Sequence, residues 1–179
     1  MADNVLGRDF AADRPATEWV SDITYFEFDR QWHYLTIVLE LADRAIVSWV
    51  ISVEMTAEST TVAALKQVVA KRKPQDELFF QSYRGSQCSC GNFREELASG
   101  GATQSMSLRG NCWFNAVAES FRKTIKSECI DRQVFTSPQQ AWCVIFHFTE
   151  GRYNTNRIHT ALRGPTVRRA YEKETQRHN

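Results

Sequence analysis

The feature that most constrains the fold of this chain is a run of three strand patterns joined by short links. Residues 20–28 (VSDITYFEF) alternate loosely between polar and apolar side chains, and residues 34–41 (YLTIVLEL) place four aliphatic side chains on one face. Residues 45–53 (AIVSWVISV) are almost entirely apolar. Because the links, 29–32 and 42–44, are short enough for hairpin turns, the three segments predict an antiparallel meander.

Helix patterns and one further strand pattern follow the meander. Residues 57–72 carry apolar side chains at helical spacing and end in KRKP, whose cations suit a helix C-terminus and whose proline blocks continuation. The short apolar segment 77–82 predicts a buried strand, and because a helix precedes it, we expect the strand to lie parallel to its neighbour. Asn92 and Glu95 resemble a capping pattern for a short helix that ends at Gly100.

The second half of the chain is dominated by helix patterns. A long helix is predicted from about Asn115 to Ile130, after the flexible-looking stretch SMSLRGN. Pro138 opens another helix that runs to about Glu150. A mixed sheet followed by helices predicts an α/β domain.

The long helix has two distinct faces. One is an apolar stripe with a spacing of four residues, made of Val117, Phe121, Ile125 and Cys129. The other places a carboxylate among three cations, namely Glu119, Arg122, Lys123 and Lys126. This second face has two interpretations: a solvated surface with a Glu119–Lys123 pair worth about 0.3 kcal/mol, or a metal-binding carboxylate beside a phosphate-contacting surface. Periodicity alone favours the solvated surface.

Composition excludes several classes of protein. The formal net charge of +1 gives no whole-molecule attraction to nucleic acid, so any such binding must come from a local patch. The 5 cysteines include no CxxC pair, so neither a disulfide framework nor a zinc knuckle is indicated. The chain shows no signal-peptide pattern and no apolar run long enough to cross a bilayer, and we expect a cytoplasmic protein without a membrane partner.

Longer phrases connect the chain to a known family. They are WVSDITYF, WHYLTIVLELADRAIVSW, SYRGSQC, QSMSLRGNCWFNAVAESFRKTIKSE and YNTNRIHTAL. Their wording and order resemble the catalytic core of bacterial insertion-sequence transposases of the retroviral-integrase (DDE) type, over roughly residues 4–162. The resemblance implies a ribonuclease H-like fold with a mixed five-stranded sheet flanked by helices. It assigns residues 1–165 to the catalytic core and leaves 166–179 as a charged C-terminal tail.

The resemblance also implies a set of catalytic residues. Such transposases carry two aspartates and a glutamate, which hold Mg²⁺ or Mn²⁺ for the cleavage and joining of DNA strands, with 35 residues between the second and third acid. Asp22 matches the first acid and Glu119 the third, but the second falls on Tyr83, and residues 84–118 are the expected 35 in number. A tyrosine phenol is neutral at pH 7 and is a poor metal ligand. The resemblance therefore implies weakened metal binding and impaired phosphoryl transfer.

The implied partner of the domain is DNA, both the element ends and the target. A set of basic and amide side chains surrounds the implied cleft and is expected to contact DNA: Arg84, Arg109, Asn111, Arg122, Lys123, Lys126 and Arg157. The resemblance further implies a homo-oligomer, and a helix-turn-helix region for end recognition that another segment or subunit would supply.

Two alternative functions stay open on the sequence. One is a catalytically inactive DNA-binding or assembly remnant, whose binding to duplex DNA would be salt-sensitive, indifferent to Mg²⁺ and unaffected by Glu119→Gln. The other is a general metal nuclease, which needs the same metals and shares the defect at Tyr83.

Overall fold

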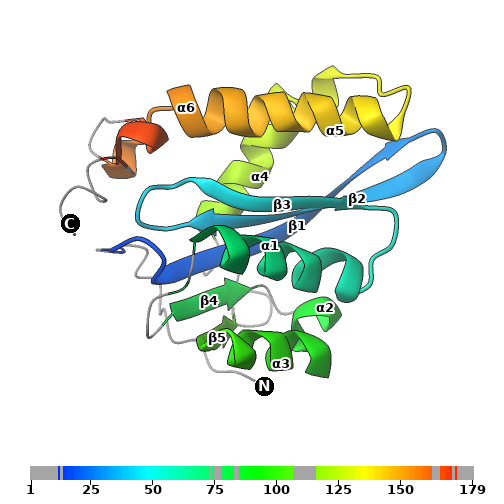
Figure 1. The fold of residues 1–179 in the computed structure, drawn as a ribbon. Coiled ribbons are helices and arrows are strands. Elements are labelled where there is room, and N and C mark those ends of the chain that lie inside the picture. Colours follow the sequence, from blue (N-terminus) through cyan, green and yellow to red (C-terminus); the bar gives the residue numbers. More distant parts are fainter. Residues whose placement is uncertain are drawn as a thin grey trace.

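The sheet places its longest strand in the middle. The structure is a computed structural model and describes residues 12, 14–72, 74, 78–82, 85–106, 116–162, 166–170 and 172. The strands are β1 (Glu18–Phe28), β2 (Gln31–Glu40), β3 (Ile46–Ser52), β4 (Leu78–Ser82) and β5 (Ala102–Met106). They form a five-stranded sheet in the order β3-β2-β1-β4-β5 (Figure 1). Strand β1 is therefore covered on both edges.

The predicted meander and the predicted parallel strand are both confirmed. Strands β1, β2 and β3 pair antiparallel in chain order, whereas β4 pairs parallel with β1 and β5. The β1–β2 turn contains Asp29 and Arg30, both with positive φ (52° and 57°), which suits the right-handed twist of a tight hairpin. Arg44 in the β2–β3 turn also has a positive φ, of 62°.

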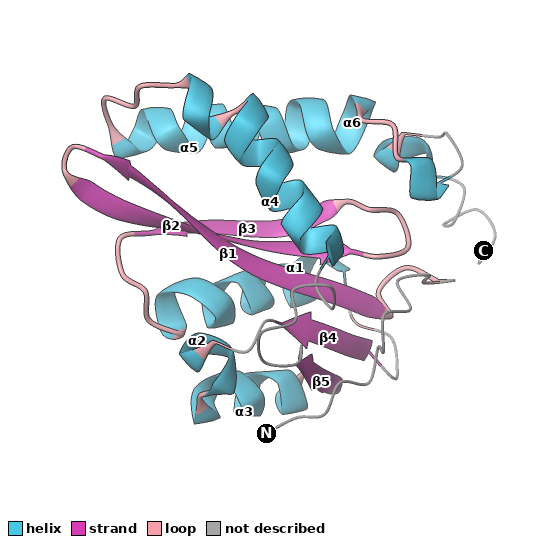
Figure 2. Cartoon of the chain, turned by 180° about the vertical axis from the view of Figure 1, so that it is seen from behind, coloured by secondary structure: helices cyan, strands magenta, loops and turns pink. Residues whose placement is uncertain are grey.

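Helices cover both faces of the sheet. On one side lie α1 (Ala63–Arg72), preceded by the π-helical turn η1 (Glu58–Val62), and the helices α2 (Ser86–Ser89) and α3 (Gly91–Ser99). On the other side lie α4 (Ala116–Glu128), η3 (Ile130–Arg132) and α5 (Pro138–Phe146), which continues through η4 (His147–Tyr153) and α6 (Asn154–Asn156) to η5 (Thr160–Leu162). Seen from behind, α4 crosses the sheet over β1 (Figure 2).

The apolar stripe predicted for the long helix is the face by which α4 packs on the core. Phe121, Ile125 and Cys129 are buried. The ring of Phe121 meets that of Tyr153 edge to face, with 4.7 Å between their centroids. Beneath the other face of the sheet, Phe80 of β4 meets Phe93 of α3 in the same way at 5.6 Å. The first contact joins α4 to η4 and the second joins β4 to α3, so both helical layers are packed against the sheet.

Three local expectations differ from the structure. Strand β5 includes Ser105 and Met106, which belong to the stretch interpreted as flexible, and its pairing with β4 stabilises a segment without a strand pattern of its own. The capping prediction at Asn92 is wrong, because α3 begins after Cys90 and the Asn92 amide donates instead to Glu58 Oε1 at 2.6 Å. Helical structure also continues beyond Glu150 to Asn156.

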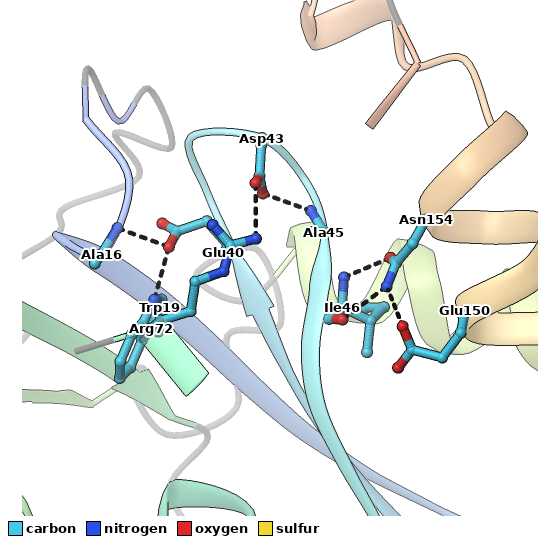
Figure 3. A network of polar contacts seen from close by, with 9 residues as sticks. All are labelled: Ala16, Trp19, Glu40, Asp43, Ala45, Ile46, Arg72, Glu150 and Asn154. Atoms are coloured by element: carbon cyan, nitrogen blue, oxygen red, sulfur yellow. Dashed lines mark hydrogen bonds and ion pairs between the residues drawn. The ribbon is translucent and has the colours of Figure 1, made fainter. Parts of the chain in front are cut away.

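A buried polar network joins β2, the β2–β3 turn and α1 (Figure 3). Glu40 Oε2 accepts hydrogen bonds from the backbone N–H of Ala16 and from Trp19 Nε1, both at 2.8 Å. Asp43 accepts the Ala45 N–H at 2.9 Å and pairs with Arg72 Nη2 at 2.9 Å. Glu40 thus anchors the segment that enters β1.

Burial of Glu40 makes the stability of the fold depend on pH. Burial, and secondly the charge of Asp43, raises the pKa of Glu40 from 4.5 to about 7. The folded protein therefore holds this proton more tightly than the unfolded chain does, so stability present below pH 4.5 is lost as the pH rises through about 7. We predict that Glu40→Gln raises the free energy of unfolding above about pH 7.5 by up to roughly 3 kcal/mol and has little effect near pH 4.5.

Urea denaturation across this pH range tests the prediction, with the exposed Glu95→Gln as control. Asp22, whose pKa is also raised, contributes equally to both proteins, so the difference between them isolates Glu40. Equal pH slopes for Glu40→Gln and the wild type would contradict the prediction.

Among the described residues, no helix combines the length and apolar character needed to cross a bilayer.

Candidate active site

Asp22 lies on the central strand, on the face crossed by α4. Successive side chains of a strand alternate between faces, so Asp22 shares its face with Phe26, and Phe26 packs on Phe135 beyond α4 at 5.5 Å. The Asp22 side chain is only 13% exposed, and its Oδ1 accepts the backbone N–H of Ile23 at 3.0 Å. A largely buried carboxylate therefore projects from a rigid strand toward a helix.

Glu119 approaches this carboxylate from the first turn of α4 and is half-buried. Burial is the largest influence on Asp22 and raises its pKa to about 6. The charge of Arg122 and the Ile23 N–H lower this pKa, and the charge of Glu119 raises it. Arg122, which follows Glu119 by one turn of α4, contacts Asp22, so the fold places the first and third predicted acids on adjoining parts of β1 and α4.

Arg122 makes the closest cationic contact to the site. It follows Glu119 by three residues, which places both on one side of α4. Its Nε lies 3.3 Å from Asp22 Oδ2, and the two form an ion pair. The sequence placed Arg122 on the DNA-facing flank, but its contact with Asp22 was not foreseen.

The described part of β4 ends one residue short of position 83. Gln81 pairs with Val20, which precedes Asp22 by two residues on the neighbouring strand, and Ser82 is the last described residue of β4. Both Gln81 and Ser82 are fully buried. Four of the predicted site residues lie outside the described residues, namely Tyr83, Arg84, Arg109 and Asn111.

The remaining predicted DNA contacts differ in their surroundings. Lys123 is exposed, whereas Lys126 Nζ donates to the backbone oxygen of Tyr25 at 3.2 Å and lies 5.3 Å from the centre of that ring. Arg157 Nη1 pairs with Glu128 Oε1 at 2.8 Å. In this structure Arg157 therefore ties the segment after α6 to the end of α4.

The chemistry of the donor set suits a hard divalent cation. Carboxylate oxygens are the ligands that Mg²⁺ and Mn²⁺ prefer, and Asp22 and Glu119 supply them from two rigid elements. Within the described ranges, no group of three His, Cys, Asp or Glu side chains is placed to hold a metal ion. The described residues thus fit the part of a metal site that two carboxylates can form.

The sheet order and the two carboxylates, one on the central strand and one on the helix that crosses it, define a ribonuclease H-like domain. Two family descriptions, both for the integrase core domain, match residues 12–112 and residues 100–166. The chain belongs to the integrase core domain family.

Individual proteins agree with this assignment. The transposase InsF for insertion sequence IS3A of Escherichia coli K12 is 34% identical over 160 residues, which are 89% of this chain and 55% of InsF. The chain thus spans about half the length of the curated relatives it matches. The fold is similar to a chain of the simian T-cell lymphotropic virus intasome complex (TM-score 0.74, 13% identity, 90% of this chain and 56% of that chain). It is also similar to the HTLV-2 integrase catalytic core solved with magnesium (TM-score 0.65, 15% identity, 89% and 98%).

Proposed function

We propose that this domain is the catalytic core of an insertion-sequence transposase, and that its cleavage and joining of DNA strands is limited by Tyr83. The observation that carries the proposal is the position of Asp22 on β1 against α4, whose Arg122 contacts Asp22 and whose Glu119 lies one turn earlier, in a member of the integrase core domain family. These acids match the first and third members of the catalytic set implied by the sequence.

The names of related proteins support the choice of substrate and partners. InsF is named as a transposase, the viral structure is an intasome, and the HTLV-2 catalytic core was solved in a dimeric form with magnesium. We extend to this chain DNA as substrate, a divalent metal as cofactor and self-association. Recognition of the element ends by a helix-turn-helix region, supplied by another segment or subunit, is part of the same proposal.

Asp22 and Glu119 would hold Mg²⁺ or Mn²⁺ through their carboxylate oxygens. When bound, the metal lowers the pKa of an attacking hydroxyl and stabilises the charge on the leaving oxygen. Asp22 must be ionised to serve as a ligand, and its pKa of about 6 leaves it charged in neutral solution. The cations of α4, Arg122 and Lys123 in particular, would contact the phosphates of the DNA strand that enters the site.

Tyr83 accounts for the proposed impairment. Two divalent ions about 4 Å apart repel each other strongly, and ligand charge from the protein must offset this repulsion. A phenol with an ordinary pKa of about 10 supplies no negative charge at neutral pH. With Asp22 and Glu119 alone, the site has two carboxylates for two metals, and we expect the second metal to bind weakly.

The assignment of Glu119 is tested in a protein that carries Tyr83→Asp. Adding Glu119→Gln is expected to lower the rate of Mn²⁺-dependent strand joining by about 100-fold or more, because a metal ligand is lost without a change in size. The exposed Asp131→Asn is the matched control and should leave the rate within about twofold. The assay uses a pre-branched DNA substrate, which reduces dependence on end recognition.

A second function, the inactive DNA-binding or assembly remnant, is favoured by one observation: only two carboxylates are brought together in the described part of the site. If no variant joins strands while the wild type and Glu119→Gln bind duplex DNA equally with and without Mg²⁺, the catalytic proposal fails and the remnant is the better account. Strand joining that survives Glu119→Gln would contradict both and place the chemistry at another site.

A further inference from the structure

The contact between Arg122 and Asp22 covers one oxygen of the candidate metal ligand. Asp22 Oδ2 is buried from solvent and accepts no hydrogen bond from any described residue. The group beside it is Arg122 Nε, at 3.3 Å. Oδ1, the other oxygen, already accepts the Ile23 N–H. The guanidinium therefore neutralises Oδ2 by proximity of charge and lies in the way of a cation that approaches it.

Electrostatics opposes the binding of a metal at the same oxygen while this contact is in place. A guanidinium carries one positive charge and a divalent metal two, and like charges at contact distance in a poorly hydrated site repel strongly. Arginine also keeps its charge under all ordinary conditions, so the conflict cannot be relieved by loss of a proton. Displacement of Arg122 therefore favours the binding of a metal at Asp22 Oδ2.

Once displaced from Asp22, the Arg122 side chain can extend into solvent and bind a DNA phosphate. Its side chain is 36% exposed, so the guanidinium can reach solvent by rotation of its own side chain. Arginine binds phosphate through paired N–H donors, and a DNA strand in the site would present phosphates along the same flank of α4. A phosphate could thus replace the carboxylate as the partner of Arg122.

We propose that Arg122 is a positioning residue that holds Asp22 in the metal-free protein. When DNA binds, the Arg122 guanidinium leaves Asp22 and contacts a DNA phosphate. DNA binding therefore raises the affinity of the site for a divalent cation. The proposal rests on the proposed transposase function. The contact between Arg122 and Asp22 would thus limit metal binding until DNA is present.

The other cations of α4 are placed differently. Lys126 donates to the Tyr25 backbone oxygen, and Lys123 is exposed at the position after Arg122. Among the ion pairs of the described residues, Arg122 is the partner of Asp22. Lys123→Gln therefore removes the same unit charge from the next position of α4 without removing the contact, and serves as the matched control.

The experiment measures Mn²⁺ affinity by electron paramagnetic resonance of the free ion, at about pH 8 where carboxylates are ionised, with and without a short DNA duplex. Without DNA, Arg122→Gln is expected to bind Mn²⁺ about 10-fold more tightly than the wild type, and Lys123→Gln at most about threefold more tightly. Addition of DNA should raise the wild-type affinity about 10-fold but that of Arg122→Gln at most about twofold. Without DNA, Arg122→Lys, which retains the positive charge, should bind Mn²⁺ within about threefold of the wild-type affinity.

Equal Mn²⁺ affinities for Arg122→Gln and Lys123→Gln would overturn the proposal, as would an equal DNA-induced gain in the wild type and Arg122→Gln. Arg122→Met provides a second neutral variant, and thermal melting verifies that each variant is folded. Asp22→Asn distinguishes a failure of the proposed metal site from a failure of the proposed role of Arg122. If it abolishes Mn²⁺ binding while Arg122→Gln matches the wild type, only the role of Arg122 fails. If Asp22→Asn binds as tightly as the wild type, the proposed metal site fails as well.

Discussion

Replacing Arg72 by methionine is expected to lower the free energy of unfolding by about 3 to 5 kcal/mol, because it leaves a buried carboxylate without its counter-ion. Asp43 is fully shielded from solvent, and Arg72 Nη2 lies 2.9 Å from its Oδ2 (Figure 3). Burial raises the pKa of Asp43, and the charge of Arg72 lowers it. Loss of Arg72 also removes a charge that lowers the pKa of the nearby Glu40.

Two further variants separate the ion pair from the packing of the Arg72 side chain. Lys71→Met, on the neighbouring exposed residue of α1, should change the free energy of unfolding by less than about 0.5 kcal/mol. Combining Arg72→Met with Asp43→Asn removes the uncompensated charge, and we expect the double variant to regain at least about 1 kcal/mol relative to Arg72→Met alone. Chemical denaturation gives these values, and a loss below about 1 kcal/mol for Arg72→Met would contradict a structural role of the pair.

Tyr83→Asp is expected to raise the rate of DNA strand joining by about 100-fold or more, an effect comparable to that of one well-placed group that stabilises transition-state charge. The substitution supplies the third carboxylate that a two-metal site needs. It also removes a bulky ring from a position next to Ser82, which is fully buried at the end of β4.

The contributions of charge and size at position 83 are separable. Tyr83→Asn has nearly the volume of aspartate but no negative charge, and we expect it to join strands no faster than about threefold above the wild type. Titration with Mn²⁺ in the presence of DNA should show one tight site in the wild type and two in Tyr83→Asp. Equal rates for Tyr83→Asn and Tyr83→Asp, both well above that of the wild type, would mean that the ring obstructs the cleft and that charge is not limiting.

The sequence predicted the strands and helices whose buried side chains recur at a regular spacing. The apolar content of residues 45–53 and the four-residue stripe from Val117 to Cys129 report which faces meet the core, so β3 and α4 were correctly located. Strand β5 was missed because ATQSM has no such repeat, and its conformation depends on pairing with β4. Asn92 failed as a cap because its amide finds Glu58, a partner far away in the sequence.

For the candidate site, the sequence predicted the two acids but not the ion pairs around them. Asp22 and Glu119 were matched by resemblance, and in the structure Asp22 contacts Arg122, one turn after Glu119 on α4. The contact of Arg122 with Asp22 joins residues 100 positions apart and has no signature in the local sequence beyond the three-residue step from Glu119. Likewise, the pairing of Arg157 with Glu128 depends on how the chain turns after α6, which composition and periodicity do not specify.

The proposed function requires a transposase core whose chemistry is limited by position 83. Its most direct test is strand joining on a pre-branched DNA substrate with Mn²⁺, in a side-by-side comparison of the wild type and Tyr83→Asp. The account predicts joined product from Tyr83→Asp and a rate about 100-fold lower, or no product, from the wild type. Equal rates in the two proteins would contradict the requirement for a third carboxylate, and no product from either would contradict the claim that position 83 alone limits the reaction.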